Sequence, residues 1–209
     1  MRKMTPLLLA LALGSSCPAA FAAPVLDEAR KEIRSELEQA RRELAEGDLS
    51  LGQGISLGRD KARAGREHQD LPPAVITRDG RLRIDGREVA ATAAQRQLLL
   101  DYRASVVEVA RAGIDVGERA ALLTMDAIDG SMLSLLASAM TGSLERKVQT
   151  TVMRELGPLA EEVCGRLPAA LAAQQRLADA MAPFRPYANL DADDVHTCRQ
   201  DIARSLANR

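Results

Sequence analysis

The stretch VITRDGRLRIDGREVAATAAQRQLLLDY, residues 75–102, decides the fold of this 209-residue chain. It contains three short extended pieces, which are separated by Asp79-Gly80 and Asp85-Gly86, and a helix start at Thr92. Asp-Gly steps between extended pieces favour β-hairpins, because a type I′ turn requires positive φ at both of its central residues. The sequence therefore predicts a small antiparallel meander that leads directly into a helix.

The predicted meander has one apolar face, which needs a cover. Leu82 and Ile84 point to one side, and the arginines around them point to the other. A sheet of this size is marginal in water on its own. Thr92 and Gln95 form a capping-box pattern at the start of a helix with an apolar face. That face consists of Leu98, Leu99, Tyr102, Val106, Val109 and Ala110. We expect it to cover the meander; a ligand-binding turn at the Asp-Gly steps is the alternative.

Two segments of the chain resemble a known family. They are DGRLRIDGREVAATAAQRQLLLDY, which begins at Asp79, and CGRLPAALAAQQRLADAMAPFRPYANLDADDVHTC, which begins at Cys164. These segments resemble the YggN-like family of secreted, mostly periplasmic proteins of Gram-negative bacteria, which have no established activity. The resemblance covers roughly residues 75–198. It implies location and architecture, and it carries no catalytic residue over to this chain.

Residues 1–22 are typical of a secretory signal peptide. Two basic residues at the start precede an apolar run at 7–13 and an A-x-A site that ends at Ala22. Cleavage one residue later is disfavoured by Pro24, so we place the mature start at Ala23. The apolar run is too short to anchor the chain in a bilayer. The sequence therefore predicts export to the periplasm.

Lipidation of Cys17 is the alternative reading of this leader. Bacterial lipoboxes normally carry leucine three residues before the cysteine, and that position holds Gly14. We therefore expect cleavage without lipidation.

The composition of the exported chain argues against a nucleic-acid-binding protein. Loss of Arg2 and Lys3 with the leader would lower the formal net charge from −1 to −3. The remaining aromatic residues would be Tyr102, Phe184 and Tyr187. Nucleic-acid binders usually combine a basic face with stacking aromatic side chains.

Residues 23–46 are predicted to form a charged amphipathic helix. Ile33, Leu37, Ala40 and Leu44 make a narrow apolar stripe of fewer than three heptads. We expect a solvated, partly frayed helix; the alternative is a homo-oligomer or partner contact through Ile33, Leu37 and Leu44.

Residues 47–73 are predicted to form a flexible linker. Five glycines interrupt this segment, charge is dense in it, and Pro72-Pro73 close it. His68 is expected to be a solvated surface residue, since it has no neighbours that could bind a metal with it.

Residues 74–209 are predicted to form a mainly α domain preceded by the small hairpin, an α+β arrangement. Gly113 should end the first helix, and a second should run over about 116–141. Gly157-Pro158 should break a third helix, Pro168 should kink or restart the next, and a last helix should start near Asp191.

Small residues recur every four positions in the predicted second helix, at Gly130, Ser134, Ser138 and Gly142. Such a stripe permits close approach of another helix. We expect a core helix, and a surface that docks a membrane or a partner is the alternative.

Cys164 and Cys198 are the cysteines that remain after cleavage. An even pair in an exported protein predicts a disulfide. A catalytic or metal-binding thiol pair is the alternative, but the C-x-x-C spacing that would favour it is absent.

Acidic residues gather before the last helix, at Asp191, Asp193 and Asp194, with His196 close behind. Carboxylates in a first helical turn accept orphan N–H groups and complement the positive helix end. We expect Asp191 and Asp194 to cap the helix, and a metal site is the alternative.

The chain lacks the familiar catalytic motifs, such as G-x-S-x-G, H-E-x-x-H and a phosphate-binding glycine loop. We therefore expect a non-enzymatic envelope binding or structural protein without a cofactor or a metal. Its partner would be an unknown envelope protein or a membrane surface. The alternative is a carboxylate-dependent hydrolase acting on an envelope polymer through Asp191, Asp193 and Asp194.

The reading of the leader predicts the N-terminus of the mature protein. Mass spectrometry of protein recovered from the periplasm should find Ala23 as the first residue. A diacylglycerol-modified Cys17 would instead place the protein on a membrane leaflet and contradict the cleavage site.

Overall fold

The computed structural model describes residues 22–51, 71–129 and 143–207 of the chain, with side chains described over 27–51, 71–126 and 154–204. As predicted, this part of the chain is mainly helical and includes a small antiparallel sheet. The elements are α1 (Ala22–Glu46), β1 (Leu49–Leu51), β2 (Ala74–Ile76), β3 (Leu82–Ile84), β4 (Arg87–Glu88), α3 (Ala93–Asp129), α5 (Ser143–Ala180), the 3-10 helix η2 (Ala182–Tyr187) and α6 (Ala192–Ala207).

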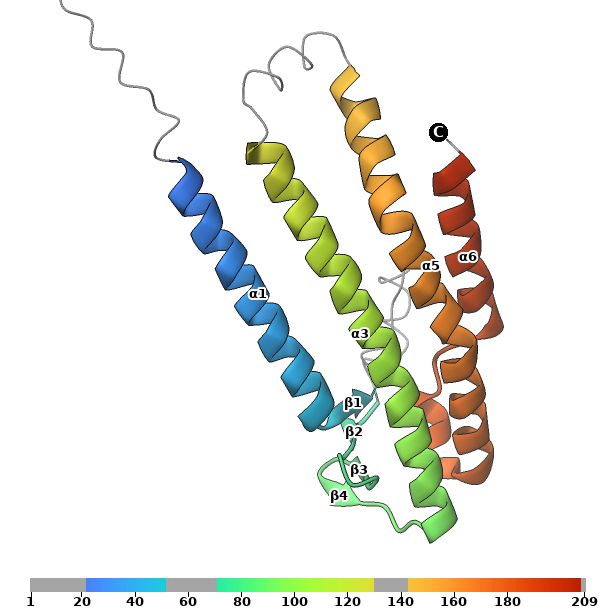
Figure 1. Ribbon diagram of the computed structural model, residues 1–209. Coiled ribbons are helices and arrows are strands. Elements are labelled where there is room, and N and C mark those ends of the chain that lie inside the picture. The colour runs from blue at the N-terminus through green and yellow to red at the C-terminus, as the bar shows by residue number, and fades with distance from the viewer. Residues whose placement is uncertain (1–21, 52–70, 130–142, 208–209) are drawn as a thin grey trace, which may run out of the picture.

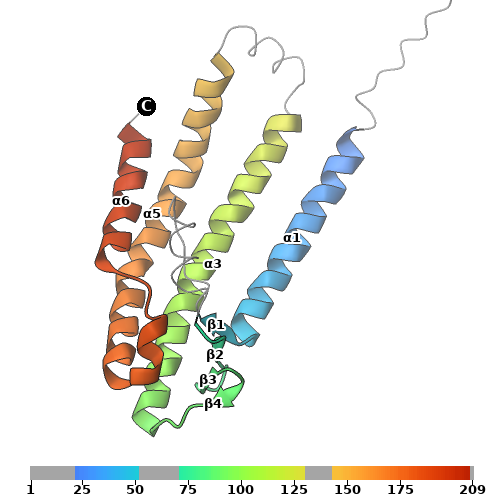
Figure 2. The same ribbon diagram turned by 180° about the vertical axis from the view of Figure 1, so that it is seen from behind.

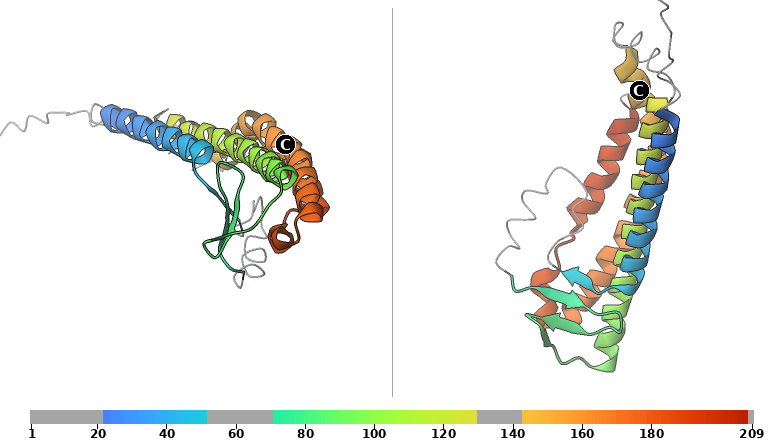
Figure 3. Two further views of the ribbon diagram at one scale, coloured as in Figure 1. Left: turned by 90° about the horizontal axis from the view of Figure 1, so that it is seen from below. Right: turned by 90° about the vertical axis from the view of Figure 1, so that its left-hand side faces the viewer.

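The four α-helices lie side by side in the order α1, α3, α5, α6 (Figures 1 and 2). Seen from below, they form one curved layer, and the sheet and η2 lie together on one side of it (Figure 3). The sheet therefore covers only the end of the layer where α3 begins. The two outer helices, α1 and α6, each pack against a single neighbouring helix of the layer.

The sheet has four strands in the order β1-β2-β3-β4, and every pairing is antiparallel. The predicted hairpin is confirmed, with Ile76 opposite Leu82 and Val75 opposite Arg83. Strand β1 corrects the expectation of a linker from residue 47 onward. It pairs with β2 because Leu49 and Leu51 pack against the buried core, which outweighs the effect of nearby glycines.

The main core lies between the sheet, the first half of α3, the end of α5 and η2. Ile76, Leu82 and Leu99 are fully buried in it, so the predicted cover of the meander by the helix is confirmed. The rings of Tyr102 and Phe184 meet edge to face, with their centroids 5.2 Å apart. Burial raises the pKa of Tyr102 to about 12. Phe184 and Tyr187 of η2 are therefore part of the same core as the sheet and α3.

Helix α3 runs without a break through Gly113, where the sequence predicted an end. The two helices expected on either side of this residue are one, as far as Asp129. A glycine in a helix costs about 1 kcal/mol relative to alanine. Full burial of one valine contributes about 1.5 to 3 kcal/mol. Val109 and Ala112 are buried immediately before Gly113, so packing outweighs the local penalty.

Helix α5 likewise continues through Gly157-Pro158 and Pro168, where a break and a restart were predicted. An internal proline costs about 3 kcal/mol because it removes a hydrogen bond and crowds the preceding turn. Apolar side chains of α5 are buried over several turns after Pro158, and their burial outweighs that cost. They are Val163, Leu167, Ala170, Ala173 and Leu177.

The C-terminal helix α6 is held by a covalent bond and by an amide clamp. The predicted disulfide joins Cys164 of α5 to Cys198 of α6, with their Cα atoms 5.8 Å apart. The buried Gln174 side chain donates to the Leu190 carbonyl at 2.7 Å and accepts from the Leu190 N–H at 3.1 Å. Val195 and Cys198 pack on the second buried cluster, which α3 and α5 share. Among the side chains described in α6, Val195 and Cys198 are the ones that pack on this cluster.

Helix α1 packs along α3, whereas the sequence predicted a solvated helix. Ile33, Leu37, Ala40 and Leu44 are each partly buried. On the same face, Arg41 lies 2.7 Å from Asp115 and 2.6 Å from Glu118 of α3. The hydrogen bonds to Glu118 and Asp115 raise the pKa of Arg41. No side chain described in α1 is fully buried, so the contact combines partly buried apolar side chains with charge pairs.

Some predictions concern positions outside the described residues. These are the signal peptide as far as residue 21, Cys17, most of the predicted linker with His68, and the small-residue stripe from Gly130 to Gly142.

The thin packing of α6 predicts that Cys198→Ser lowers the melting temperature and exposes Arg199 and Arg204 to trypsin. The loop-entropy model assigns about 3 to 4 kcal/mol to a bridge across 34 residues. Cleavage should be compared with and without reductant, with the hairpin as an internal control. Two reactive thiols in the denatured, unreduced mature protein would contradict the bridge, and an unchanged melting temperature would contradict its stabilising role.

Candidate functional site

The first turn of the hairpin differs from the type I′ turn that Asp79-Gly80 predicted. Gly80 has φ 77°, but Asp79 does not have positive φ. The Thr77 N–H donates to the Arg81 carbonyl at 2.9 Å, and the Gly80 N–H donates to the Thr77 carbonyl at 3.0 Å. This is a three-residue loop with a left-handed glycine. The second turn has the predicted form, with φ of 50° at Asp85 and 73° at Gly86.

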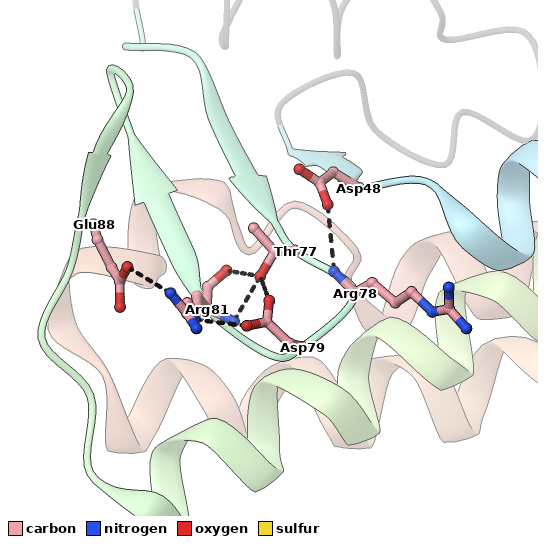
Figure 4. A network of polar contacts seen from close by, with 6 residues as sticks. All are labelled: Asp48, Thr77, Arg78, Asp79, Arg81 and Glu88. Carbon is pink, nitrogen blue, oxygen red and sulfur yellow. Dashed lines mark hydrogen bonds and ion pairs between the residues drawn. The ribbon is translucent and has the colours of Figure 1, made fainter.

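A polar network stiffens the first turn (Figure 4). The Thr77 hydroxyl donates to Asp79 Oδ1 at 2.6 Å, and the Arg81 N–H donates to Thr77 Oγ1 at 3.0 Å. Arg81 Nε lies 2.6 Å from Asp79 Oδ2, and its Nη1 lies 3.4 Å from Glu88 of β4. The hydrogen bond from Thr77, helped by the charge of Arg81, lowers the pKa of Asp79. The guanidinium of Arg81 is therefore fixed by two carboxylates.

Gly80 seats this turn against α3. A Cβ atom at this position would lie 2.8 Å from Leu100 Cγ and 3.0 Å from the Arg96 carbonyl oxygen. Any side chain here would push the turn away from the helix. The positive φ and the close approach together explain why glycine occupies this position.

Asp48, the residue before β1, comes to the first turn of the hairpin from a distant part of the sequence. Arg103 of α3 donates through Nη2 to the carbonyls of Leu44, Ala45 and Gly47, at 3.3, 2.9 and 2.8 Å. A guanidinium at a helix C-terminus is favourable because the carbonyls there are unpaired and partly negative. The contact sets the point where the chain leaves α1 and turns into β1.

An open depression lies beside the first turn of the hairpin, with a volume of about 510 Å³. Its lining residues are Asp48, Thr77, Arg78, Asp79, Arg81 and Arg83. The Arg78 N–H donates to Asp48 Oδ1 at 3.3 Å, which joins the turn to β1. Two carboxylates and three guanidiniums thus line one surface.

Two of the three arginines are available to a ligand. Among the described residues, the guanidiniums of Arg78 and Arg83 have no hydrogen-bond or ion-pair partner, and both residues are exposed. Figure 4 shows the Arg78 side chain running away from Arg81, toward the helices. Arg83 points outward because its neighbours Leu82 and Ile84 face the core. The two free guanidiniums therefore point in different directions.

The acidic cluster before α6 has the capping role that the sequence predicted. The Asp194 N–H donates to Asp191 Oδ1 at 2.8 Å, and the Asp191 N–H donates to Asp194 Oδ2 at 2.9 Å. His196 contacts Gln200 one turn later, at 2.7 Å. Within the described residues, no three His, Cys, Asp or Glu side chains are grouped so that they could hold a metal ion.

Sequence reasoning found the turn but missed the depression beside it. The Asp-Gly steps located Asp79 and Gly80, and strand alternation placed Arg83 on the outer face. Asp48 lay inside the predicted linker and had no local pattern to single it out. Only the pairing of β1 with β2 brings it beside Arg78.

The lowered pKa of Asp79 predicts a pH-dependent contribution to stability. A carboxylate with a folded pKa below its unfolded value stabilises the fold above the unfolded pKa, near 3.8, and that contribution is lost as pH falls through the folded pKa. Urea unfolding should show Asp79→Asn less stable than wild type at pH 7, with the difference shrinking below about pH 4. Glu36→Gln, on an exposed position of α1, is the matched control, and a constant difference at all pH values would contradict this assignment.

No family model, curated protein or solved structure matches the chain. None of the helices in the described part of the chain is both long and apolar enough to cross a membrane. The disulfide between Cys164 and Cys198 indicates an oxidising compartment.

Proposed function

We propose that this protein is an exported, non-enzymatic binding protein of the bacterial periplasm that acts through the outer side of its hairpin. The observation that carries the proposal is the depression lined by Asp48 and three arginines, two of which have free guanidiniums. Charged groups that are left without partners on a braced surface are available for recognition of a ligand.

The backbone around the depression is held in one conformation, which favours a binding surface. Thr77 and Asp79 hold the turn, Gly80 seats it on α3, and Ile76 and Leu82 bury the opposite side of the sheet. A surface whose backbone is fixed before binding loses less conformational entropy when a ligand arrives. The hairpin can therefore present its outer charges in one arrangement.

The proposed periplasmic location is supported by the leader, the disulfide and a family resemblance. The first 22 residues have the pattern of a cleavable signal peptide. The disulfide supports an oxidising compartment, and the bacterial periplasm is one. The resemblance of residues 75–198 to the YggN-like family favours the same location.

The hydrolase alternative loses the feature that suggested it. Asp191 and Asp194 are engaged with each other's backbone N–H groups, which leaves Asp193 as the free carboxylate of the cluster. The usual hydrolytic arrangement needs a second carboxyl group at a defined distance. A homo-oligomer through Ile33, Leu37 and Leu44 would have to share the face that α1 presents to α3.

The proposal is tested by capture of a component from envelope extract, with and without detergent. Immobilised mature protein should retain a component that the double variant Arg78→Gln/Arg83→Gln loses. Arg34→Gln/Arg42→Gln is the matched control, because both residues are exposed arginines of α1 without a described partner. We expect the control to behave like the wild type.

Two results would contradict the proposed function. One is equal retention by the site variant and the wild type. The other is turnover of an envelope polymer by the wild type that Asp193→Asn abolishes, which would instead establish the hydrolase.

A further inference from the structure

The charges that line the depression are unequally engaged. Asp79 uses both carboxylate oxygens, one for Thr77 and one for Arg81, and Arg81 also meets Glu88. Asp48 uses Oδ1 for the Arg78 N–H, and Oδ2 has no described partner. The groups left for a ligand are therefore two guanidiniums, of Arg78 and Arg83, and one carboxylate oxygen.

We infer that the depression binds a ligand with at least two anionic phosphate groups, one at Arg78 and the other at Arg83. This inference rests on the proposed function and names the ligand class of the same site. A guanidinium carries a fixed fork of donors that matches phosphate oxygens. Because the two free guanidiniums point in different directions, we expect a single small anion to meet only one of them at a time.

The size and the remaining polar groups agree with an extended ligand. A volume of about 510 Å³ falls within the range of roughly 300 to 1,000 Å³ for small-molecule sites. Arg81 also lines the depression, and its partners Asp79 and Glu88 neutralise it. The free oxygen of Asp48 can accept a hydrogen bond from a hydroxyl group between the phosphates.

Two arginines of the hairpin lie on its outer side, and Arg87, which pairs with the inward-facing Ile84, does not. Leu82 and Ile84 occupy the inward positions of β3, which leaves Arg81 and Arg83 on the outward ones. Ser50, Val75, Arg83 and Glu88 lie opposite one another across the four strands. Among the described residues of this row, Arg83 is the cation without a partner.

The probes are inorganic phosphate and tripolyphosphate, added at low ionic strength to the ¹⁵N-labelled mature protein. Tripolyphosphate should cause saturable amide shifts confined to residues 48–50 and 75–88. Inorganic phosphate should bind at least about tenfold more weakly, because it loses one of the two charge-assisted contacts. Arg78→Gln and Arg83→Gln should each weaken tripolyphosphate about tenfold, and Arg34→Gln/Arg42→Gln should leave it unchanged.

A second arm identifies the source of the phosphate groups. Sedimentation with phosphatidylglycerol vesicles, compared with phosphatidylcholine vesicles, tests a lipid headgroup. Retention that is lost in the Arg78→Gln/Arg83→Gln variant assigns the shared chemistry to lipid. Tripolyphosphate binding without retention assigns it to a soluble or polymeric phosphate.

The inference is overturned if phosphate and tripolyphosphate bind equally, if neither shifts the hairpin, or if the control variant weakens binding as much as the site variants. These outcomes are separable from failure of the proposed function. A captured envelope component that tripolyphosphate does not displace would leave the binding function intact and remove the phosphate assignment. Circular dichroism of each variant verifies that the exposed substitutions leave the fold unchanged.

Discussion

Burial of the hairpin's inner face against α3 is the contact on which the rest of the structure depends. Ile76, Leu82 and Leu99 are fully buried there, and Phe184 closes the same core from η2. Full burial of each large apolar side chain contributes about 1.5 to 3 kcal/mol before ordering entropy is subtracted. Without this contact the short strands would be marginal. The outer face of the sheet could then hold no fixed arrangement of charges.

The helical layer secures its two edges by different means. At one edge, α6 is joined to α5 by the Cys164–Cys198 bond and by the buried Gln174 clamp. At the other edge, α1 meets α3 through partly buried apolar side chains and through Arg41 with its two carboxylates. Exposed ion pairs are weak and are screened by salt. The edge formed by α1 is therefore more sensitive to ionic strength than the edge formed by α6.

The depression exists because three parts of the chain meet at one turn. Asp48 directly precedes β1, the turn carries Arg78 and Asp79, and Arg81 and Arg83 lie at the start of β3 and within it. Arg103 supports the arrangement from beneath, where it binds the carbonyls at the end of α1. The same turn is thus tied both to the helix layer and to the edge of the sheet. Its charged groups owe their spacing to contacts that lie far apart in the sequence.

Local chemistry was enough to predict the features that act over a few residues. The Asp85-Gly86 turn, the Thr92 and Gln95 capping box and the Asp191 and Asp194 cap all formed as expected, because neighbouring atoms complete their hydrogen bonds. Hydrophobic alternation also predicted which side of the hairpin is buried. The disulfide followed from the even number of cysteines that the predicted cleavage of the leader would leave.

Features that depend on distant contacts could not be read from the sequence. Gly113, Pro158 and Pro168 each weaken a helix locally, yet α3 and α5 continue because burial against neighbouring helices outweighs those penalties. The strand β1 forms because β2 supplies hydrogen-bond partners that no residue near Leu49 offers. The candidate site depends on that pairing. Local hydrogen bonding therefore predicted the turns and caps. Tertiary contacts, which outweigh the local penalties of about 1 to 3 kcal/mol for glycine and proline in a helix, set the lengths of the helices and the position of Asp48.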